Sequence, residues 1–143
     1  MIYRATMDDI TVVAELAAKV WESDALSLIE EFKGFLEDKE SAVFLCRVGG
    51  KTVGFAQFQL RHDYVEGTKT SPVGYLEGIF VEPEHRKQGY GKRLVAACES
   101  WAKEQGCAEF ASDCLLENVQ SIQFHLRSGF QEANRIVCFT KQL

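Results

Sequence analysis

The stretch VGYLEGIFVEPEHRKQGYGKRL, residues Val73 to Leu94, decides the fold. Its first part, Val73 to Val81, is rich in β-branched and aromatic residues and predicts a strand. Pro83 cannot donate a hydrogen bond to a β-ladder, so the residues around it predict a turn. A helix then begins near Gly89, where glycine lets the backbone come close to a ligand.

The start of this helix is a candidate site for a phosphate or pyrophosphate. The first N–H groups of a helix have no partner inside it, and the helix dipole is positive at that end. The residues expected to bind are those of the turn and the first helical turn: Arg86, Lys87, Gln88, Gly89, Tyr90, Gly91 and Lys92. The same residues also fit a plain helix start that contains glycine, so the rest of the chain has to decide.

The composition is that of a soluble globular protein, with 46% hydrophobic and 26% charged residues. A length of 143 residues predicts one domain, residues 1–143. No apolar run is long enough to span a bilayer, and Met1 to Ala5 does not resemble a signal peptide. The net charge of −5 argues against a nucleic-acid partner and favours a cationic one. Five scattered cysteines without a C-x-x-C pair indicate reduced thiols in a cytoplasmic protein.

Hydrophobic periodicity and turn residues predict an element order of β-α-α-β-β-β-α-β-α-β-β. The first helix is expected over Ile10–Trp21. The second is expected after a cap at Ser23 or Asp24, with the apolar stripe Leu28, Phe32, Phe35 and Leu36. Two more helices are expected from Gly89 to Gly106 and from Asn118 to His125. Strands are expected at Ile2–Ala5, Ala42–Val48, Thr52–Leu60, Val73–Val81, Glu109–Leu115 and Arg135–Lys141, the last in a section that begins at Phe130. The hairpin turn Gly49-Gly50 implies antiparallel pairing and the later helix crossovers imply parallel pairing. The sequence therefore predicts an α/β (α+β) fold with a mixed sheet.

Two motifs resemble those of one enzyme superfamily. The order Arg86-x-x-Gly89-x-Gly91 after a strand resembles the acetyl-CoA pyrophosphate loop of the GNAT N-acetyltransferases. Asn118-x-x-Ser121-x-x-Phe124-His125-x-x-x-Gly129-Phe130 resembles a second segment of that superfamily, and the element order of the whole chain resembles the GNAT fold. The resemblance implies a central sheet with helices on both faces and acetyl-CoA as co-substrate. The resemblance also implies further cofactor-binding residues: Ile79, Phe80, Val81, Asn118 and Phe124.

A narrower resemblance covers loop residues that a fold alone would not require. The blocks are His62-Asp63-Tyr64-Val65-x-Gly67-Thr68, Ser71-Pro72-Val73, Leu76-Glu77-Gly78-Ile79-Phe80-Val81 and Ala111-Ser112-Asp113. They resemble the aminoglycoside N-acetyltransferases that modify the 6'-amino group. The resemblance implies a homodimer that uses acetyl-CoA directly and without a metal. Asn134 departs from the acid expected there, in a region near the partner subunit.

Acetyl transfer to an amine requires that the ammonium lose a proton, that an oxyanion be stabilised, and that the departing thiolate gain a proton. Glu77 and Asp113 are the candidate acids, because carboxylates are rarely placed in strands without a partner or a role. They can equally be exposed or paired with arginines. The resemblance favours Asp113 as the base and Glu77 as a substrate anchor, with the backbone N–H of Phe80 or a neighbour polarising the thioester.

His125 stands where the superfamily often has a tyrosine acid, and imidazole can donate a proton near neutral pH. A lone histidine on a helix is otherwise a structural residue. The three histidines lack metal-ligand spacing, so no metal is expected. No nucleophile triad is present, although Cys114 beside Asp113 leaves a covalent acetyl-enzyme open.

A site for a polycationic sugar needs acids and a flat apolar surface. Trp21 and Tyr64 are the candidate ring surfaces, and the further acids are Asp63, Glu66, Glu22 and Asp24. Two other readings stay open: an acetyltransferase for a polyamine or another small metabolite amine, and a catalytically silent acetyl-CoA-binding regulator.

Overall fold

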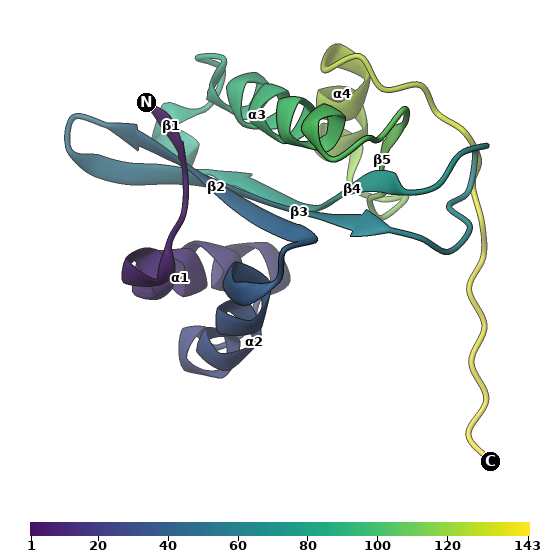
Figure 1. Cartoon of the computed structure of the whole chain (residues 1–143), viewed down its shortest axis with the longest axis horizontal. Coiled ribbons are helices and arrows are strands. Elements are labelled where there is room, and N and C mark those ends of the chain that lie inside the picture. The colour runs from purple at the N-terminus through teal and green to yellow at the C-terminus, as the bar shows by residue number, and fades with distance from the viewer.

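The computed structural model describes residues 1–143 and places a five-stranded sheet between two pairs of helices (Figure 1). The strands are β1 (Ile2–Arg4), β2 (Ser41–Val48), β3 (Lys51–Arg61), β4 (Val73–Val81) and β5 (Phe110–Ser112). The helices are α1 (Ile10–Trp21), α2 (Ala25–Glu37), α3 (Tyr90–Glu104) and α4 (Val119–Arg127). Short 3-10 turns at Met7–Asp9 and Pro83–His85 lead toward α1 and α3. None of the helices has the length and apolar character needed to cross a membrane.

The sheet follows the chain, in the order β1-β2-β3-β4-β5. The first four strands pair antiparallel and β5 pairs parallel with β4, which confirms the predicted mixed sheet. Gly49 and Gly50 form the predicted two-residue turn, with φ values of 55° and 80° that glycine adopts without strain. The parallel pair requires a crossover, and α3 supplies it.

Two hydrophobic clusters bind the helices to opposite faces of the sheet. Val43 and Leu45 of β2 pack with α1 and α2, whereas Ala42 and Cys46 pack with α3. This alternation is the period of two that a strand buried on both faces requires. The helices therefore cover both faces, with α1 and α2 on one side and α3 and α4 on the other (Figure 1).

The helix boundaries follow the predicted caps. The Asp24 side chain accepts from the Leu26 N–H at 3.2 Å, and the Asn118 side chain accepts from the Ser121 N–H at 3.1 Å. Gly106, with φ of 87°, follows α3 directly in the left-handed conformation that ends many helices. These helix ends are set by residues close in sequence, which is why the sequence pattern predicts them.

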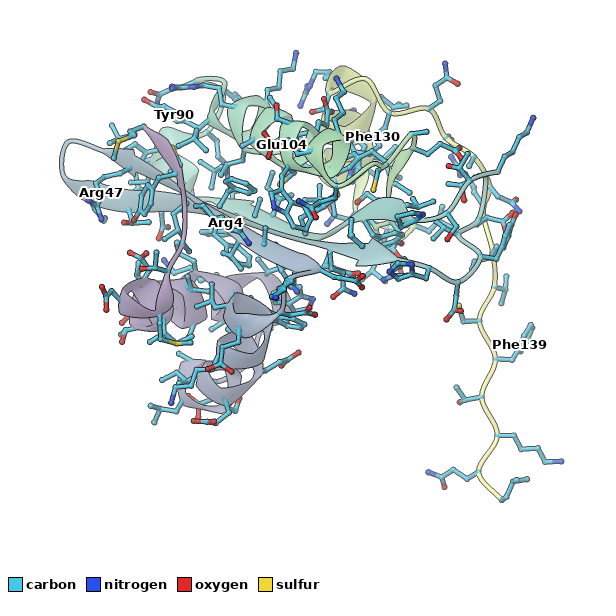
Figure 2. The ribbon with its side chains drawn as sticks, in the orientation of Figure 1. Arg4, Arg47, Tyr90, Glu104, Phe130 and Phe139 are labelled. Atoms are coloured by element: carbon cyan, nitrogen blue, oxygen red, sulfur yellow. The ribbon has the colours of Figure 1, made fainter.

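The predicted closing strand Arg135–Lys141 is wrong. No strand follows α4, and the segment runs away from the body with Phe139 standing clear (Figures 1 and 2). Ile136, Val137 and Phe139 are 69%, 77% and 89% exposed. Their strand propensity is real, but a strand forms only where another strand offers its edge.

The start of this segment does contact the body. The Asn134 side-chain amide donates to Glu66 at 2.9 Å, and a Cβ on Gly67 would lie 2.5 Å from that of Ala133. The fifth strand is also shorter than the predicted Glu109–Leu115, since it pairs with β4 over Phe110–Ser112 alone.

Candidate active site

The strands β4 and β5 separate partway along β4. Their pairing ends at Leu76 and Ser112, while β4 continues to Val81. The pairing of β4 with β3 has a bulge at this point. Gln57 pairs with Gly78 and Phe58 pairs with Leu76, so Glu77 has no opposite residue on β3. Bulges next to functional sites redirect a side chain, and at this one the Glu77 carboxylate reaches the Gln59 and Arg61 side chains of β3.

Beyond the separation, β4 has a free edge. The Glu82 N–H donates to the Val53 carbonyl of β3 at 2.8 Å, and strand alternation then turns the amide of Phe80 toward β3 as well. The same alternation turns the amides of Ile79 and Val81 outward. The Arg86 side chain caps this edge by donating to the Val81 carbonyl at 2.7 Å.

The turn before α3 presents a run of amides that have no acceptor within the chain. The first helical bond is from Arg93 to Gly89 at 3.1 Å, so the N–H groups of Lys87 to Lys92 stay unpaired. Lys87 and Gly89 have positive φ values of 60° and 87°. For lysine this is an uncommon conformation, and such residues gather at binding sites. We call these unpaired amides the amide cradle, and their arrangement suits an anionic group.

Gly91 joins this turn to α4. A Cβ at Gly91 would lie 2.7 Å from the Phe124 ring, so the close packing of α3 on α4 requires glycine here. Asn118, another predicted binding residue, caps α4 at its other end. The structure thus brings both predicted motifs to one side of the sheet.

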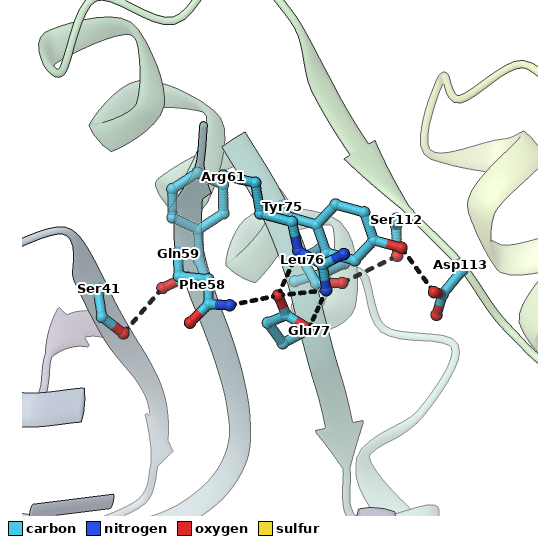
Figure 3. Close-up of polar contacts among 9 residues, drawn as sticks. All are labelled: Ser41, Phe58, Gln59, Arg61, Tyr75, Leu76, Glu77, Ser112 and Asp113. Atoms are coloured by element: carbon cyan, nitrogen blue, oxygen red, sulfur yellow. Dashed lines mark hydrogen bonds and ion pairs between the residues drawn. The ribbon is translucent and has the colours of Figure 1, made fainter. Parts of the chain in front are cut away.

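Glu77 is held by donors from β3 (Figure 3). The Arg61 guanidinium donates to both carboxylate oxygens, at 2.8 Å to Oε1 and 2.9 Å to Oε2. The Gln59 amide also donates to Oε1 at 2.8 Å. The Glu77 side chain is 19% exposed and the Arg61 side chain 39%, so this ion pair is only partly shielded from water. Two environments were expected for Glu77, an exposed position or a pair with arginine. The structure shows the pair with arginine.

Asp113 follows β5 and accepts from a tyrosine of β4 (Figure 3). The Tyr75 hydroxyl donates to Asp113 Oδ2 at 2.6 Å, and no group of the chain donates to Oδ1. Burial, and then this hydrogen bond, raise the pKa of Tyr75 well above its ordinary value, so its hydroxyl keeps its proton. Tyr75 therefore acts as a fixed donor that leaves one carboxylate oxygen open.

His125 makes two hydrogen bonds inside the protein. Its Nδ1 lies 2.7 Å from the Ser121 carbonyl, which can only accept, and its Nε2 lies 2.8 Å from Ser112 Oγ. The Ser112 hydroxyl also lies 3.1 Å from the Leu76 carbonyl, at the point where β4 and β5 separate. His125 is therefore linked to the gap through Ser112.

The two predicted aromatic surfaces differ in position. Trp21, 42% exposed, lies over β4, because a Cβ on Gly78 would be 2.6 Å from its ring. This places Trp21 over the residue that follows Glu77 in β4. Tyr64 is 73% exposed in the loop after β3 and makes no contact with the two carboxylates.

The sequence did not identify four side chains of this site: Gln59, Arg61, Tyr75 and Ser112. The available signal was the polar end of an otherwise apolar β3, placed by the antiparallel register opposite β4. No group of three or more His, Cys, Asp or Glu side chains is arranged to hold a metal ion.

Comparison with known proteins agrees with this geometry. The sequence pattern of the Acetyltransferase (GNAT) family matches residues 5–130. The aminoglycoside N(6')-acetyltransferase type 1 of Stenotrophomonas maltophilia is 46% identical over 99% of this chain and 93% of its own length. The same-named protein of Acinetobacter haemolyticus is 40% identical over 90% of this chain and 89% of its own.

Solved structures are similar over the whole chain. The crystal structure of the apo aminoglycoside antibiotic 6'-N-acetyltransferase AAC(6')-IG from Acinetobacter haemolyticus superposes with a TM-score of 0.95 at 37% identity, covering 100% of this chain and 99% of that one. AAC(6')-Iy in complex with the bisubstrate analog CoA-S-monomethyl-acetylneamine gives 0.95 at 33% identity, with coverage of 100% and 98%. The split sheet, the amide cradle and these likenesses together place the chain in the GNAT acetyltransferase family, among the aminoglycoside 6'-N-acetyltransferases.

Proposed function

We propose that this protein transfers the acetyl group of acetyl-CoA to the 6'-amino group of aminoglycosides. One observation carries the proposal: Glu77 and Asp113 are both fixed where β4 and β5 separate, with the amide cradle at the end of the same β4. An amine that enters the gap meets two carboxylates. A thioester that lies along the free edge of β4 brings its carbonyl to the same place.

For the co-substrate, we assign the pyrophosphate to the unpaired amides of Gln88 to Gly91, with Arg86, Lys87 and Lys92 adding positive charge. The pantetheine arm would lie along Ile79 to Val81. Phe124, packed against Gly91, and Asn118, at the start of α4, form the opposite wall.

The thioester carbonyl needs a hydrogen-bond donor as it becomes an oxyanion. Of the amides near Phe80, those of Ile79 and Val81 point to the free edge, whereas that of Phe80 faces β3. The alternation therefore favours the neighbours of Phe80 as the donor.

Asp113 is the proposed general base, because its Oδ1 is open to an ammonium while Oδ2 is held by Tyr75. Glu77 is the proposed anchor, since its Oε2 accepts from Arg61 alone and keeps room for a second donor. The neutral amine then attacks the thioester carbon directly. The nitrogen of the tetrahedral intermediate gives its second proton to water, the carbon–sulfur bond breaks, and the sulfur leaves as a thiolate.

The thiolate needs a proton, and His125 can supply it through Ser112. With Nδ1–H donated to Ser121, an imidazolium at His125 donates from Nε2 to Ser112 Oγ, and the Ser112 hydroxyl turns from the Leu76 carbonyl, its acceptor in the structure, toward the sulfur. Ser112 gives its proton to sulfur and regains one from Nε2. Ser112→Ala and His125→Phe should then cause the same change in the pH profile of kcat.

The drug's sugar rings need a surface as well as charge. Trp21 lies over Gly78 of β4 and is 42% exposed, so it is the proposed surface for a sugar face. Asp63, Glu66 and Tyr64, on the loop after β3, and Glu22 and Asp24, after α1, are proposed as more distant contacts for the other ammonium groups. Glu66 is already bonded to Asn134 at the start of the terminal segment.

The terminal segment supports a homodimer. Residues 135–143 leave the body without a partner strand and expose Ile136, Val137 and Phe139. A second copy would cover these side chains, which a monomer leaves in water. Because Asn134 sits where this segment departs, a subunit contact to the drug would come from this region.

We propose that residues 1–143 act as one acetyltransferase domain, since both core clusters use the same sheet. We also propose that the protein works in the cytoplasm, where acetyl-CoA is available and its free cysteines stay reduced.

A thiol-release assay with acetyl-CoA and a panel of amines tests the function. The panel should hold kanamycin, tobramycin, a related drug with a 6'-hydroxyl, and a polyamine. Rapid turnover of the two 6'-amino drugs alone is expected. Turnover of the polyamine alone would favour the metabolite reading, and acetyl-CoA binding without turnover of any amine would favour a silent regulator.

A further inference from the structure

Two side chains outside the proposed chemistry connect its two carboxylates (Figure 3). We infer that Tyr75 and Arg61 are positioning residues for acetyl transfer: Tyr75 holds Asp113, Arg61 holds Glu77, and each leaves one oxygen for the substrate amine. The inference rests on the proposed roles of Glu77 and Asp113.

Tyr75 cannot reach a substrate itself. The residue is 6% exposed and packs with Val65, Val73 and Ala111 in a small cluster of its own. Its hydroxyl is nevertheless 2.6 Å from Asp113 Oδ2, the shorter end of the range for such bonds. A rigid, buried donor of this kind fixes the rotamer of Asp113 and leaves Oδ1 facing outward.

Arg61 holds the Glu77 carboxylate in a similar way. Its Nε and Nη2 donate to Glu77 Oε1 at 3.0 and 2.8 Å, and Gln59 adds a third donor at 2.8 Å. An sp² oxygen has two lone pairs, so Oε1 is saturated. Oε2 accepts one bond, from Arg61 at 2.9 Å, and keeps room for an ammonium.

The two holders also fix each other. The guanidinium carbon of Arg61 lies 3.5 Å from the centre of the Tyr75 ring, a stacked cation–π contact. The buried Tyr75 ring therefore also supports the guanidinium that holds Glu77. Together the unit of Glu77, Asp113 and Arg61 carries a net charge of about −1, the complement of one ammonium group.

The chain contains a second tyrosine–arginine stack that serves as a matched control. Arg47 lies 5.0 Å over the Tyr3 ring and donates to its hydroxyl at 3.0 Å, and that hydroxyl lies 3.4 Å from Asp9. This trio joins β1, β2 and the turn before α1. It has the same groups as the trio of Tyr75, Arg61 and Asp113 but touches neither carboxylate of the site.

The first test is a double-mutant cycle on Tyr75 and Asp113. Tyr75→Phe keeps the ring under Arg61 and removes only the hydroxyl, and we expect kcat to fall about 10-fold, since a misplaced group can cost up to about 10²-fold. The pH profile of kcat/KM should change as well, because the lost donor touches the proposed base. In the Asp113→Asn background, Tyr75→Phe should have almost no further effect. Tyr3→Phe should leave kcat and the profile unchanged.

The second test is the matching cycle on Arg61 and Glu77. Arg61→Gln should raise KM for the amine about 10-fold, and Arg61→Lys should not rescue it, because an ammonium lacks the fork that binds both oxygens. In the Glu77→Gln background the same change should be nearly silent, and Arg47→Gln is the control. Melting temperatures of all variants separate these effects from a general loss of stability.

The amine for both cycles is whichever amine the wild type acetylates. If that amine is a polyamine, the proposed substrate fails while the coupling to the carboxylates can still be measured. Independent, additive effects of the two partners would overturn the inference, as would variants that lose stability with unchanged kcat, KM and pH profile. A lower KM in Arg61→Gln would show instead that Arg61 competes with the amine. A wild type that acetylates no amine would overturn both the function and the inference.

Discussion

Asp113 is the residue on which the proposed chemistry depends most, because it alone offers a carboxylate oxygen without a donor at the gap between β4 and β5. Asp113→Asn keeps the shape and removes the base, so we expect kcat to fall by roughly 10²–10⁴-fold. Steady-state kinetics at neutral pH give the answer. Asp8→Asn, at an exposed position in the turn before α1, is the control. Near-normal turnover in Asp113→Asn would assign proton transfer to Glu77 or to bulk water.

Tyr75 predicts a pH dependence of stability. Burial and the hydrogen bond to Asp113 raise its pKa above the ordinary value of 10.0. The stabilisation from a group whose pKa is raised in the folded state is complete below the unfolded value, and is lost as the pH rises from there toward the folded value. Tyr75→Phe has no such proton to lose.

Between about pH 10 and pH 12, the free energy of unfolding of the wild type should therefore fall more steeply than that of Tyr75→Phe. Chemical denaturation at a series of pH values measures both slopes. Tyr3→Phe serves again as the matched control. Parallel slopes for wild type and Tyr75→Phe would contradict the assignment.

Among the elements, the start of α3 is where the packing most restricts the residue type. A Cβ at Gly91 would meet the Phe124 ring at 2.7 Å, so in Gly91→Ala either this ring or the packing of α3 on α4 must shift beside the amide cradle. We expect the variant to fold and to bind acetyl-CoA at least about 10-fold more weakly, an effect of about 1.4 kcal/mol in calorimetry.

Gly34→Ala is the matched control for Gly91→Ala. Gly34 lies inside α2 with nothing within 4 Å of its added Cβ. The control should gain about 0.5–1 kcal/mol of stability and bind acetyl-CoA normally. Unchanged affinity in a folded Gly91→Ala variant would remove the pyrophosphate from this turn.

The elements also show where sequence patterns suffice. The β4 strand, the turn at Pro83 and the start of α3 follow from local residue types, and the caps Asp24 and Asn118 follow likewise. The closing strand was wrong because strand propensity does not supply a partner edge.

The acids of the site were predictable, but their holders were not. Glu77 stands out as a charge inside an apolar strand, and Asp113 as a charge at the end of one. That Arg61 reaches Glu77 depends on the register of β3 against β4 and on the bulge at Glu77. Register is a property of two distant segments, and no local pattern contains it.

At the scale of the whole molecule, the reactivity of the cysteines tests the proposed dimer. Cys46 and Cys98 are buried, which raises the pKa of each thiol, and both should resist alkylation. Cys114 and Cys138 are exposed. If a second copy covers the terminal segment, Cys138 should become protected as protein concentration rises, while Cys114 stays reactive. Mass spectrometry of alkylated peptides follows each site, and equal labelling of both at all concentrations would contradict the proposed dimer contact.

The position of the transferred acetyl group tests the function of the whole chain most directly. NMR and mass spectrometry of the products from acetyl-CoA and kanamycin or tobramycin locate the new amide. A single acetyl group on the 6'-nitrogen is expected, together with no product at that position from a drug with a 6'-hydroxyl. Acetylation at a different amine, or no product from either 6'-amino drug while a polyamine is turned over rapidly, would contradict the account.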